Sequence, residues 1–329
     1  MKYSFIIPVY NRPDEVDELL ESLCHQTLSD FEVVIVEDGS SVPCKAVVQQ
    51  YETRLRVRYF SKPNSGPGQT RNYGVERAEG AYVLILDSDV VVPPTYLEAV
   101  EAELQANPCD AFGGPDRAHP SFSPTQKAIN YAMTSFFTTG GIRGGRKKMD
   151  KFYPRSFNMG VRTTVYRALH GFSDMRFGED IDFSTRVFKG GYACRLFPEA
   201  WVWHKRRTDF RKFFKQVHNS GIARIHLTKR HPGTLKLVHL LPAVFTLGCI
   251  VCLMGSLVCL WALLPLVAFA LLVGIDATMA ERSWNVGWRA IVASYVQLIG
   301  YGTGFLWASW RRYVLRSGEF KAFEENFYD

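Results

Sequence analysis

The first hundred residues alternate short apolar runs with amphipathic segments. Strands are expected at residues 3–9, 31–36, 56–60 and 81–86, where the runs are mostly apolar. Helices are expected at 13–26, 47–55, 68–78 and 96–105, the first with its leucines at helical spacing. Strand and helix in strict turn predict an α/β fold with a mostly parallel sheet and helices on both faces.

Polar clusters follow three of these strands. They read PVYNRP at residues 8–13, EDGSS at 37–41 and DSD at 87–89. In open parallel sheets, ligands bind beyond the carboxyl ends of the strands. We therefore expect these three loops to converge on one ligand.

A different pattern occupies residues 237–275. These 39 residues contain no Asp, Glu, Lys or Arg. Because one membrane span needs about 20 apolar residues, the run predicts a transmembrane hairpin with arms at 237–255 and 257–275. The later apolar segment 286–310 precedes Arg311, Arg312 and Arg316. Both a third span and an in-plane amphipathic helix remain open for it, because a span would place these arginines outside.

The formal net charge of +7 is concentrated before the apolar run. Between His204 and Lys236 there are ten Lys or Arg residues and one acidic residue. A basic amphipathic helix is expected at 210–229. Cations directly beside an apolar run are typical of the cytoplasmic membrane face, so the pattern favours a membrane and not nucleic acid as partner.

Further observations place the chain in a reducing compartment. The seven cysteines are scattered without metal-ligand spacing, and the N-terminus reaches Asn11 too early for a signal peptide.

We expect four parts: a catalytic domain at 1–207, a juxtamembrane helix at 208–236, the transmembrane hairpin at 237–275 and a C-terminal region at 276–329. The glycine-rich segment 115–151 is expected to be either a mobile loop over the site or an ordinary connection.

The DSD cluster suits a divalent cation. Alternation along an extended strand end would place Asp87 and Asp89 on one side and Ser88 on the other. Carboxylate oxygens facing one point favour Mg²⁺ or Mn²⁺, which can be shared with substrate phosphates. Buried acids also need a compensating partner, because desolvating a charge is costly.

The chain resembles the family 2 glycosyltransferases of the GT-A fold. The resemblance rests on ordered motifs between about residues 3 and 207: PVYNRPDEVDELLESLCHQT, VIVEDGSS, GPGQTRNYGVERAEGAYVLILDSDV, RSFNMGVRTTVY, HGFSDMRFGEDIDFSTRVFKGGY and VWHKRR. The run FFKQVHNSGIARIHLTKRHPGTLKLVHLLPAVF resembles the membrane-proximal part of succinoglycan-type glucosyltransferases.

The resemblance implies roles for particular residues. It implies a metal and diphosphate site at Asp87, Asp89 and His204, and a general base at Asp180 with Glu179 beside it. The residues implied in holding the nucleotide-sugar donor are Pro8, Tyr10, Asn11, Glu37, Asp38, Arg71, Asp87, Ser88, Asp89, Asn158, Gly160, Arg206 and Arg207.

The acidic stretch GEDID has a physical reason to hold a base. An inverting transfer needs a group that takes the proton of the acceptor hydroxyl as it attacks. Glu179, Asp180 and Asp182 are close in sequence, and repulsion with partial burial can raise one of their pKa values toward neutral pH. The alternative is a solvated acidic turn that caps a helix at 181–189.

These observations predict a membrane-associated enzyme of polysaccharide or glycolipid synthesis. It would transfer one sugar, with inversion and a divalent metal, from a nucleotide-diphosphate sugar, most readily a UDP-sugar, to a lipid-linked saccharide. Its catalytic domain would lie on the cytoplasmic side of a bacterial-type inner membrane. The QxxRW signature of processive relatives is absent, which favours addition of one sugar. A polyprenyl-phosphate glycosyltransferase and an inactive membrane-anchored nucleotide-sugar binder are the alternatives.

Overall fold

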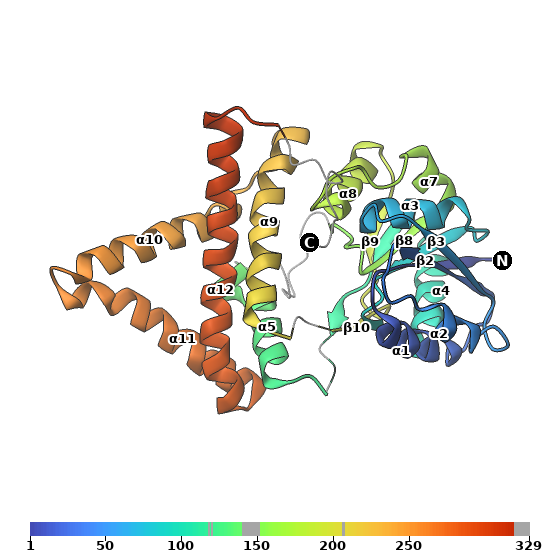
Figure 1. The fold of residues 1–329 in the computed structure, drawn as a ribbon, viewed down its shortest axis with the longest axis horizontal. Coiled ribbons are helices and arrows are strands. Elements are labelled where there is room, and N and C mark those ends of the chain that lie inside the picture. The colour runs from blue at the N-terminus through green and yellow to red at the C-terminus, as the bar shows by residue number, and fades with distance from the viewer. Residues whose placement is uncertain (118, 120, 140–151, 206–207, 319–329) are drawn as a thin grey trace. The chain divides into compact units, whose positions relative to one another are not determined.

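The computed structural model describes the chain except for residues 118, 120, 140–151, 206–207 and 319–329. The described residues form two units (Figure 1). The α/β unit contains the described residues up to 117 and from 152 to 204; the helical unit contains those between 118 and 139 and from 205 to 318. The GGIRGGRKK stretch lies outside the described residues, so the expectation of a loop over the site stays a prediction.

A mixed sheet forms the centre of the α/β unit. Within the described chain its seven strands are β1 (Tyr3–Val9), β2 (Phe31–Asp38), β3 (Val57–Lys62), β4 (Tyr82–Leu86), β6 (Ala111–Gly113), β8 (Asn158–Arg162) and β9 (Cys194–Leu196). Their order is β3-β2-β1-β4-β8-β6-β9. Strands β1 to β4 are parallel and β8 is antiparallel to both of its neighbours. The expected mostly parallel sheet is confirmed.

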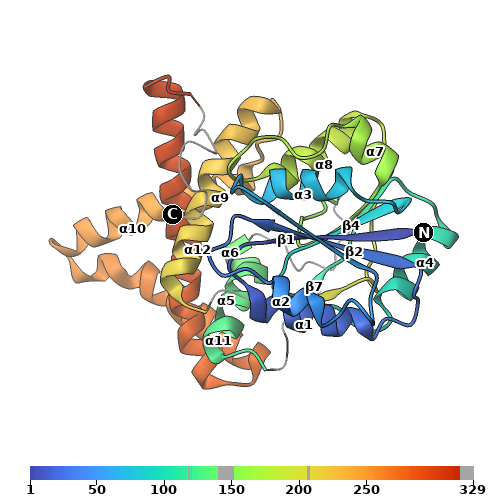
Figure 2. The ribbon, with the colours of Figure 1, turned by 45° about the vertical axis from the view of Figure 1, so that its right-hand side comes forward.

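Helices cover both faces of this sheet (Figure 2). One face packs against α1 (Pro13–Cys24), α2 (Lys45–Gln49) and α4 (Tyr96–Ala106), and the other against α3 (Pro67–Glu76), α7 (Thr163–Ala168) and α8 (Glu179–Lys189). Phe5 and Ile7 of β1 face the first layer and Ile6 the second, so the strand is apolar at successive positions. A Cβ at Gly74 would lie 2.7 Å from Ile6 Cγ2, so glycine lets α3 approach β1 closely.

The structure corrects two local expectations. The helix expected at 47–55 is limited to α2, because the chain then continues in tighter turns: Gln50 N–H donates to Val47 O and Arg54 N–H to Tyr51 O. Residues 87–89 are not an extended strand end, because the chain turns at Ser88 and Asp89 into β5 (Val90–Val91).

A small second sheet holds this turn. It is formed by β5, β10 (Val202–His204) and β7 (Asp116–Arg117), in the order β5-β10-β7. In the antiparallel pair of β10 and β5, His204 lies opposite Val90. The second sheet therefore places His204 beside the DSD turn, 115 residues away in sequence from Asp89.

The helical unit is built around one long helix. Its described elements are α5 (Pro124–Thr134), α6 (Phe136–Thr139), α9 (Phe210–Arg230), η1 (Leu237–His239), α10 (Leu241–Ser256), η2 (Leu260–Leu263), α11 (Leu264–Glu281), α12 (Trp284–Ser309) and a π-turn at Trp310–Val314. Fully buried Ala290 and Ala293 of α12 share a core with Ile129 of α5 and Phe213 of α9. The segment 124–139, expected in the catalytic domain, thus packs with the later helices.

Backbones touch where α9 meets α12. A Cβ at Gly221 would lie 2.2 Å from Tyr301 O, and one at Gly304 would lie 2.1 Å from His218 O. Glycine is therefore required at both positions for this spacing. In the described chain, two helical segments are long and apolar enough to cross a membrane: Leu260–Glu281, with mean hydropathy 2.2, and Trp284–Val314, with 1.2. The helical unit thus carries the apolar segments that association with a membrane requires.

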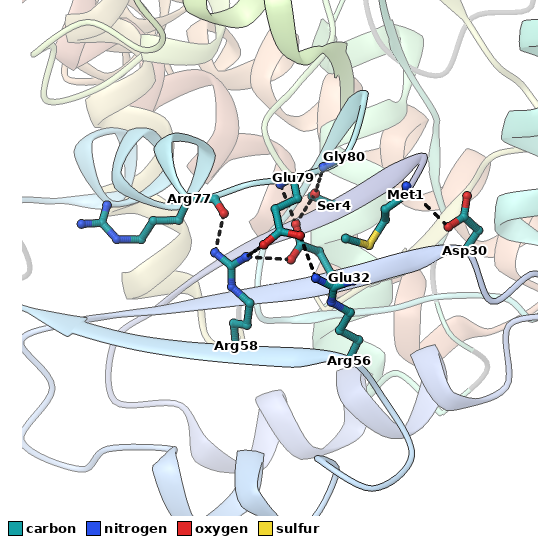
Figure 3. A network of polar contacts seen from close by, with 9 residues as sticks. All are labelled: Met1, Ser4, Asp30, Glu32, Arg56, Arg58, Arg77, Glu79 and Gly80. Carbon is teal, nitrogen blue, oxygen red and sulfur yellow. Dashed lines mark hydrogen bonds and ion pairs between the residues drawn. The ribbon is translucent and has the colours of Figure 1, made fainter.

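A buried carboxylate joins the amino ends of the central strands (Figure 3). Glu32 of β2 is inaccessible to solvent and accepts hydrogen bonds from Ser4 Oγ at 2.7 Å and from the Glu79 amide at 2.8 Å. Arg58 of β3 donates to its other oxygen at 3.2 Å and also pairs with the Glu79 carboxylate. This network lies at the edge of the sheet opposite to the three polar loops.

Replacing Glu32 by Ala should destabilise the α/β unit by about 3 kcal/mol, because Arg58, Ser4 and the Glu79 amide lose a buried acceptor. Hydrogen–deuterium exchange of peptides from β1 and β2 measures this locally. Glu52→Ala, at an exposed position after α2, should leave the exchange unchanged. Equal protection in both variants would show that the network does not stabilise the sheet.

Candidate active site

Three potential metal ligands meet at the carboxyl ends of the strands. One ligand atom from each of Asp87, Asp89 and His204 lies within 4.8 Å of the others. Asp89 is buried, whereas the Asp87 side chain keeps 31% of its surface exposed. The β4–β5 turn supplies the two carboxylates and β10 supplies the imidazole. The turn therefore achieves the convergence that was expected from an extended strand.

Asp89 has two cationic or potentially cationic partners. Arg12 Nη1 donates to Asp89 Oδ2 at 2.9 Å, and His204 Nε2 lies 3.2 Å from Asp89 Oδ1. The other ring nitrogen, His204 Nδ1, lies 3.9 Å from Asp116 Oδ2, and the imidazole stacks on Phe157 with ring centroids 4.8 Å apart. These contacts fix the plane of the imidazole and direct Nε2 toward the carboxylate.

Arg71 joins the DSD turn to the start of α8. Only 3% of this residue is exposed, and its guanidinium donates to Asp87 Oδ1 at 2.6 Å and to Glu179 Oε1 at 3.1 Å. Its guanidinium carbon also lies 5.5 Å from the centroid of the Phe172 ring. One buried cation therefore compensates acids from two motifs that are 92 residues apart in sequence.

The first turn of α8 carries the expected acids. Gly178, with φ +84°, precedes the helix, and Asp180 accepts from Arg155 Nε at 2.6 Å and from the Ile181 amide at 2.8 Å. Burial and the neighbouring Asp180 carboxylate raise the pKa of Glu179 to about 7, against the lowering effect of Arg71. The acidic stretch is therefore not a solvated turn: Asp180 is buried and Glu179 holds its proton more tightly than an ordinary glutamate.

Glu37 and Asp38 are engaged by the protein. Glu37 is 1% exposed and accepts from the Cys44 amide at 2.9 Å and from Tyr59 Oη at 3.0 Å, and it also pairs with Ser40. Asp38 is inaccessible to solvent; it accepts from the amides of Ser65 and Gly66, both at 2.9 Å, and pairs with Lys62. Their contacts hold the loops around the site, and direct contact with the nucleotide stays a prediction.

Asn158 and Gly160 of β8 likewise have packing roles. Asn158 is buried, accepts from Tyr96 Oη at 2.8 Å and donates to Ala200 O at 2.8 Å. A Cβ at Gly160 would lie 2.0 Å from the Phe112 ring, so glycine makes room for that ring. Contact of either residue with a sugar stays a prediction.

The remaining predicted donor contacts surround the first strand end. Pro8 is buried within β1, and Tyr10 is partly exposed beyond it. Asn11, at φ +54°, accepts from the Val42 amide at 2.9 Å and so fastens the loop after β2. Ser88 is buried in the DSD turn. Arg206 and Arg207 lie outside the described residues.

The donor set fits a divalent cation. Two carboxylates and one imidazole within 4.8 Å suit Mn²⁺, which accepts nitrogen as well as oxygen ligands, and the carboxylates also suit Mg²⁺. The arginines at Asp87 and Asp89 supply the compensation that the sequence left unidentified.

Two residues of the site were not singled out from the sequence. They are Arg12 and Arg155. Arg12 lies in PVYNRP and Arg155 is the first residue of RSFNMG, and a cation within such a motif is a signal for an acidic partner. Sequence alone does not say which acid each arginine meets.

Comparison with known proteins gives a family match. Residues 4–169, half of the chain, match the family model described as glycosyl transferase family 2. A glycosyltransferase of Bacillus subtilis (strain 168), uncharacterized and called EpsJ, is 28% identical over 204 residues, which are 60% of this chain and 58% of the relative. Two further uncharacterized glycosyltransferases, from Rickettsia species, are spanned over only 22% and 13% of their lengths.

Solved structures share the fold. A mannosyltransferase of Pyrobaculum calidifontis, PcManGT, in complex with GDP-Man and Mn²⁺, matches with a TM-score of 0.58 and 18% identity, over 93% of this chain and 87% of that chain. Residues 1–349 of Staphylococcus aureus TarS, in complex with UDP-GlcNAc, match with a TM-score of 0.50 and 20% identity, over 95% and 92% of the two chains. At these identities the likeness shows the fold alone.

Replacing Glu179 by Gln should flatten the dependence of thermal stability on pH. Because the pKa of Glu179 is raised from 4.5 to about 7 on folding, the folded chain binds the extra proton between these values. Stability is then highest at the acidic end and falls as the pH rises through about 7. Midpoints of the unfolding transition of the α/β unit, measured between pH 5 and 8 with EDTA present, test this.

Glu76→Gln is the matched control, because the Glu76 side chain is 73% exposed at the end of α3. It should keep the wild-type slope. A wild-type slope in Glu179→Gln as well would mean that Glu179 does not titrate in this range.

Proposed function

We propose that this chain, which belongs to glycosyl transferase family 2, transfers one sugar from a nucleotide-diphosphate sugar to a lipid-linked saccharide, with inversion at the anomeric carbon and with a divalent cation. The enzyme class and the nucleotide-sugar donor follow from the family. The acceptor, the stereochemistry and the metal are our proposals, and a UDP-sugar is the donor that we favour.

One observation carries this proposal. Arg71 binds Asp87 of the candidate metal site and Glu179, the neighbour of the candidate base, with the same guanidinium. The two halves of a transfer reaction, departure of the diphosphate and deprotonation of the acceptor, need groups held at a fixed separation. A shared buried cation provides that constraint.

Asp180 is the residue to which we assign the base. It would accept the proton of the acceptor hydroxyl while that oxygen attacks the anomeric carbon from the side opposite to the diphosphate. Arg155 Nε lies 2.6 Å from its Oδ2 and holds the carboxylate in place. Glu179 touches Arg71 and is assigned a positioning role.

Asp87, Asp89 and His204 would hold the divalent cation. When bound, such an ion would neutralise negative charge on the leaving diphosphate. Arg12 and Arg71 lie at the same carboxylates and would keep the acids correctly placed before the ion and donor bind. The Mn²⁺ in the complex of PcManGT supports this assignment.

A lipid-linked acceptor is proposed from the helical unit. Large apolar side chains are exposed along α10 and α11, and α9 carries cations in its first and last turns. An enzyme bound to a bilayer through these helices meets lipid-linked acceptors in two dimensions. We propose that this bilayer is a bacterial-type inner membrane and that the catalytic domain lies on its cytoplasmic side.

The test is sugar transfer by detergent-solubilised full-length protein with UDP- and GDP-sugars, Mn²⁺ and a membrane lipid extract. Asp89→Ala should lower the turnover by at least about 100-fold, because it removes a ligand of the metal and diphosphate. Release of nucleotide and labelling of extracted lipid are the readouts. Asp30→Ala is the control, because Asp30 is an exposed carboxylate at the opposite edge of the sheet. Turnover that survives Asp89→Ala would contradict the proposal.

The variant Asp180→Asn distinguishes a saccharide acceptor from a lipid phosphate acceptor. A saccharide hydroxyl needs a base, so turnover should fall by about 100-fold or more. A polyprenyl phosphate is already ionised, and substantial turnover by Asp180→Asn would favour that acceptor. Absence of both transfer and donor hydrolysis in the wild-type protein, across the donors and extracts, would favour an inactive nucleotide-sugar binder.

A further inference from the structure

The tip of the α10–α11 hairpin is apolar and fully displayed. Val258 is 93% exposed, and Leu257, Leu260 and Trp261 are each 78% exposed. No charged residue occurs between 240 and 275, so no charged group at the tip favours contact with water. A turn that emerged on the far side of a bilayer would place these side chains in an aqueous or headgroup layer.

The uncharged part of each arm is short for a crossing, although Leu260–Glu281 as a whole is long and apolar enough, because that segment includes Asp276 and Glu281. Helix α10 has 16 residues, and the second arm reaches its first charge, Asp276, after the 16 residues from 260 to 275. At 1.5 Å per residue such an arm is about 24 Å long, against about 30 Å for the hydrocarbon core. Asp276 Oδ2 accepts from Tyr131 Oη of α5 at 2.5 Å, and a carboxylate at this end of the arm is disfavoured in hydrocarbon.

The turn satisfies much of its own backbone. The amides of Leu257, Val258 and Cys259 donate to carbonyls of the last turn of α10 at 2.9–3.2 Å, and the Ala262 amide donates to Cys259 O at 3.0 Å. The hydroxyl of Ser256, the polar side chain at the tip, donates to Leu253 O at 2.7 Å. These bonds lower the cost of placing the turn in hydrocarbon, where water cannot compensate polar groups.

Helix α12 is accompanied by a charged helix. Gly221 of α9 touches Tyr301, His218 touches Gly304, and Lys229 Nζ lies 5.5 Å from the centroid of the Tyr313 ring. The two helices thus run parallel and side by side to their carboxyl ends (Figure 1). The charges of α9 are Arg211, Lys212, Lys215, Arg224, Lys229 and Arg230. If α12 crossed the bilayer, it would carry several of these cations into the hydrocarbon.

We propose that α10 and α11 enter a lipid bilayer and turn back within it, so that α9, α11's last turn and the end of α12 lie on one side of the membrane. The occupant of the apolar surface is lipid acyl chain, because exposed apolar side chains run the length of both arms. These are Leu241, Val244, Leu247, Ile250, Val251, Leu253, Met254, Leu264, Val267, Leu271, Leu272 and Ile275.

The cations of α9 complement the anionic headgroups at the same surface. This inference rests on the membrane association in the proposed function, and it opposes the expectation of a transmembrane hairpin. It favours the in-plane alternative for the segment 286–310.

Native Cys259, exposed at the tip, is the probe. Membrane vesicles of both orientations containing the full-length protein are treated with a membrane-impermeant maleimide, and labelling is located by mass spectrometry. Cys259 should stay unlabelled from either face and become labelled after detergent is added. Leu235→Cys, before the hairpin, and Leu315→Cys, after α12, should be labelled from one and the same face; both positions are exposed.

Labelling of Cys259 from the face opposite to Leu235→Cys would overturn the proposal, because the hairpin would then cross. Labelling of Leu315→Cys from the face opposite to Leu235→Cys would also overturn the proposal, because α12 would then cross the membrane. Labelling of Cys259 from the face of Leu235→Cys would also overturn the proposal, because the tip would then lie in water on that side. Sugar transfer is measured in the same vesicles, so loss of the proposed activity is distinguishable from a different topology.

Val258→Asp gives an independent readout. If the tip lies within hydrocarbon, the added charge should lower the membrane partition coefficient of the protein by about tenfold. Leu235→Asp should leave that coefficient unchanged. Equal partitioning of both variants would place the tip in water and would contradict the inference.

Discussion

The burial of one guanidinium constrains the whole α/β unit. Arg71 is 3% exposed, and a cation this deep is tolerated only where carboxylates meet it. Asp87 arrives from the end of β4 and Glu179 from the start of α8, on elements that the sheet and its second helix layer must hold in register. The parallel strands, the tight β4–β5 turn and the glycine before α8 all serve the placement of these two acids. The site is therefore organised around charge compensation before any ligand binds.

Much of this fold could be predicted from the periodicity of its apolar residues. Strand β1 and helix α1 occur where a short apolar run and helical spacing predict them, because their burial depends on local pattern. The DSD turn was harder: the expectation of an extended strand end was wrong, yet Asp87 and Asp89 still converge. Their third neighbour, His204, comes from a strand that pairs with β5. Such a pairing depends on contacts distant in sequence, which no local spacing encodes.

The charged residues of the candidate site show the same limit of prediction from sequence. Asp180 could be singled out because three acids in one short stretch are unusual. Its partner Arg155 could not, because one arginine in a loop has no pattern of its own. Glu37 and Asp38 show a related limit: their oxygens accept hydrogen bonds from loop amides, which the sequence does not indicate, and their contact with the nucleotide stays a prediction. A sequence motif gives the residue types, but only the folded structure shows which of their polar atoms are hydrogen-bonded within the protein.

Among the described residues, the hydrophobic clusters of the α/β unit and of the helical unit are separate. The sheet packs between two clusters of its own, whereas the cluster around Ala290 and Phe213 belongs to the helical unit alone. Unfolding of the full chain is therefore not expected to be a single two-state transition, and one melting temperature would not describe it. Detergents and lipids act on the helical core, so extraction conditions can loosen that unit while the strand-end site keeps its geometry.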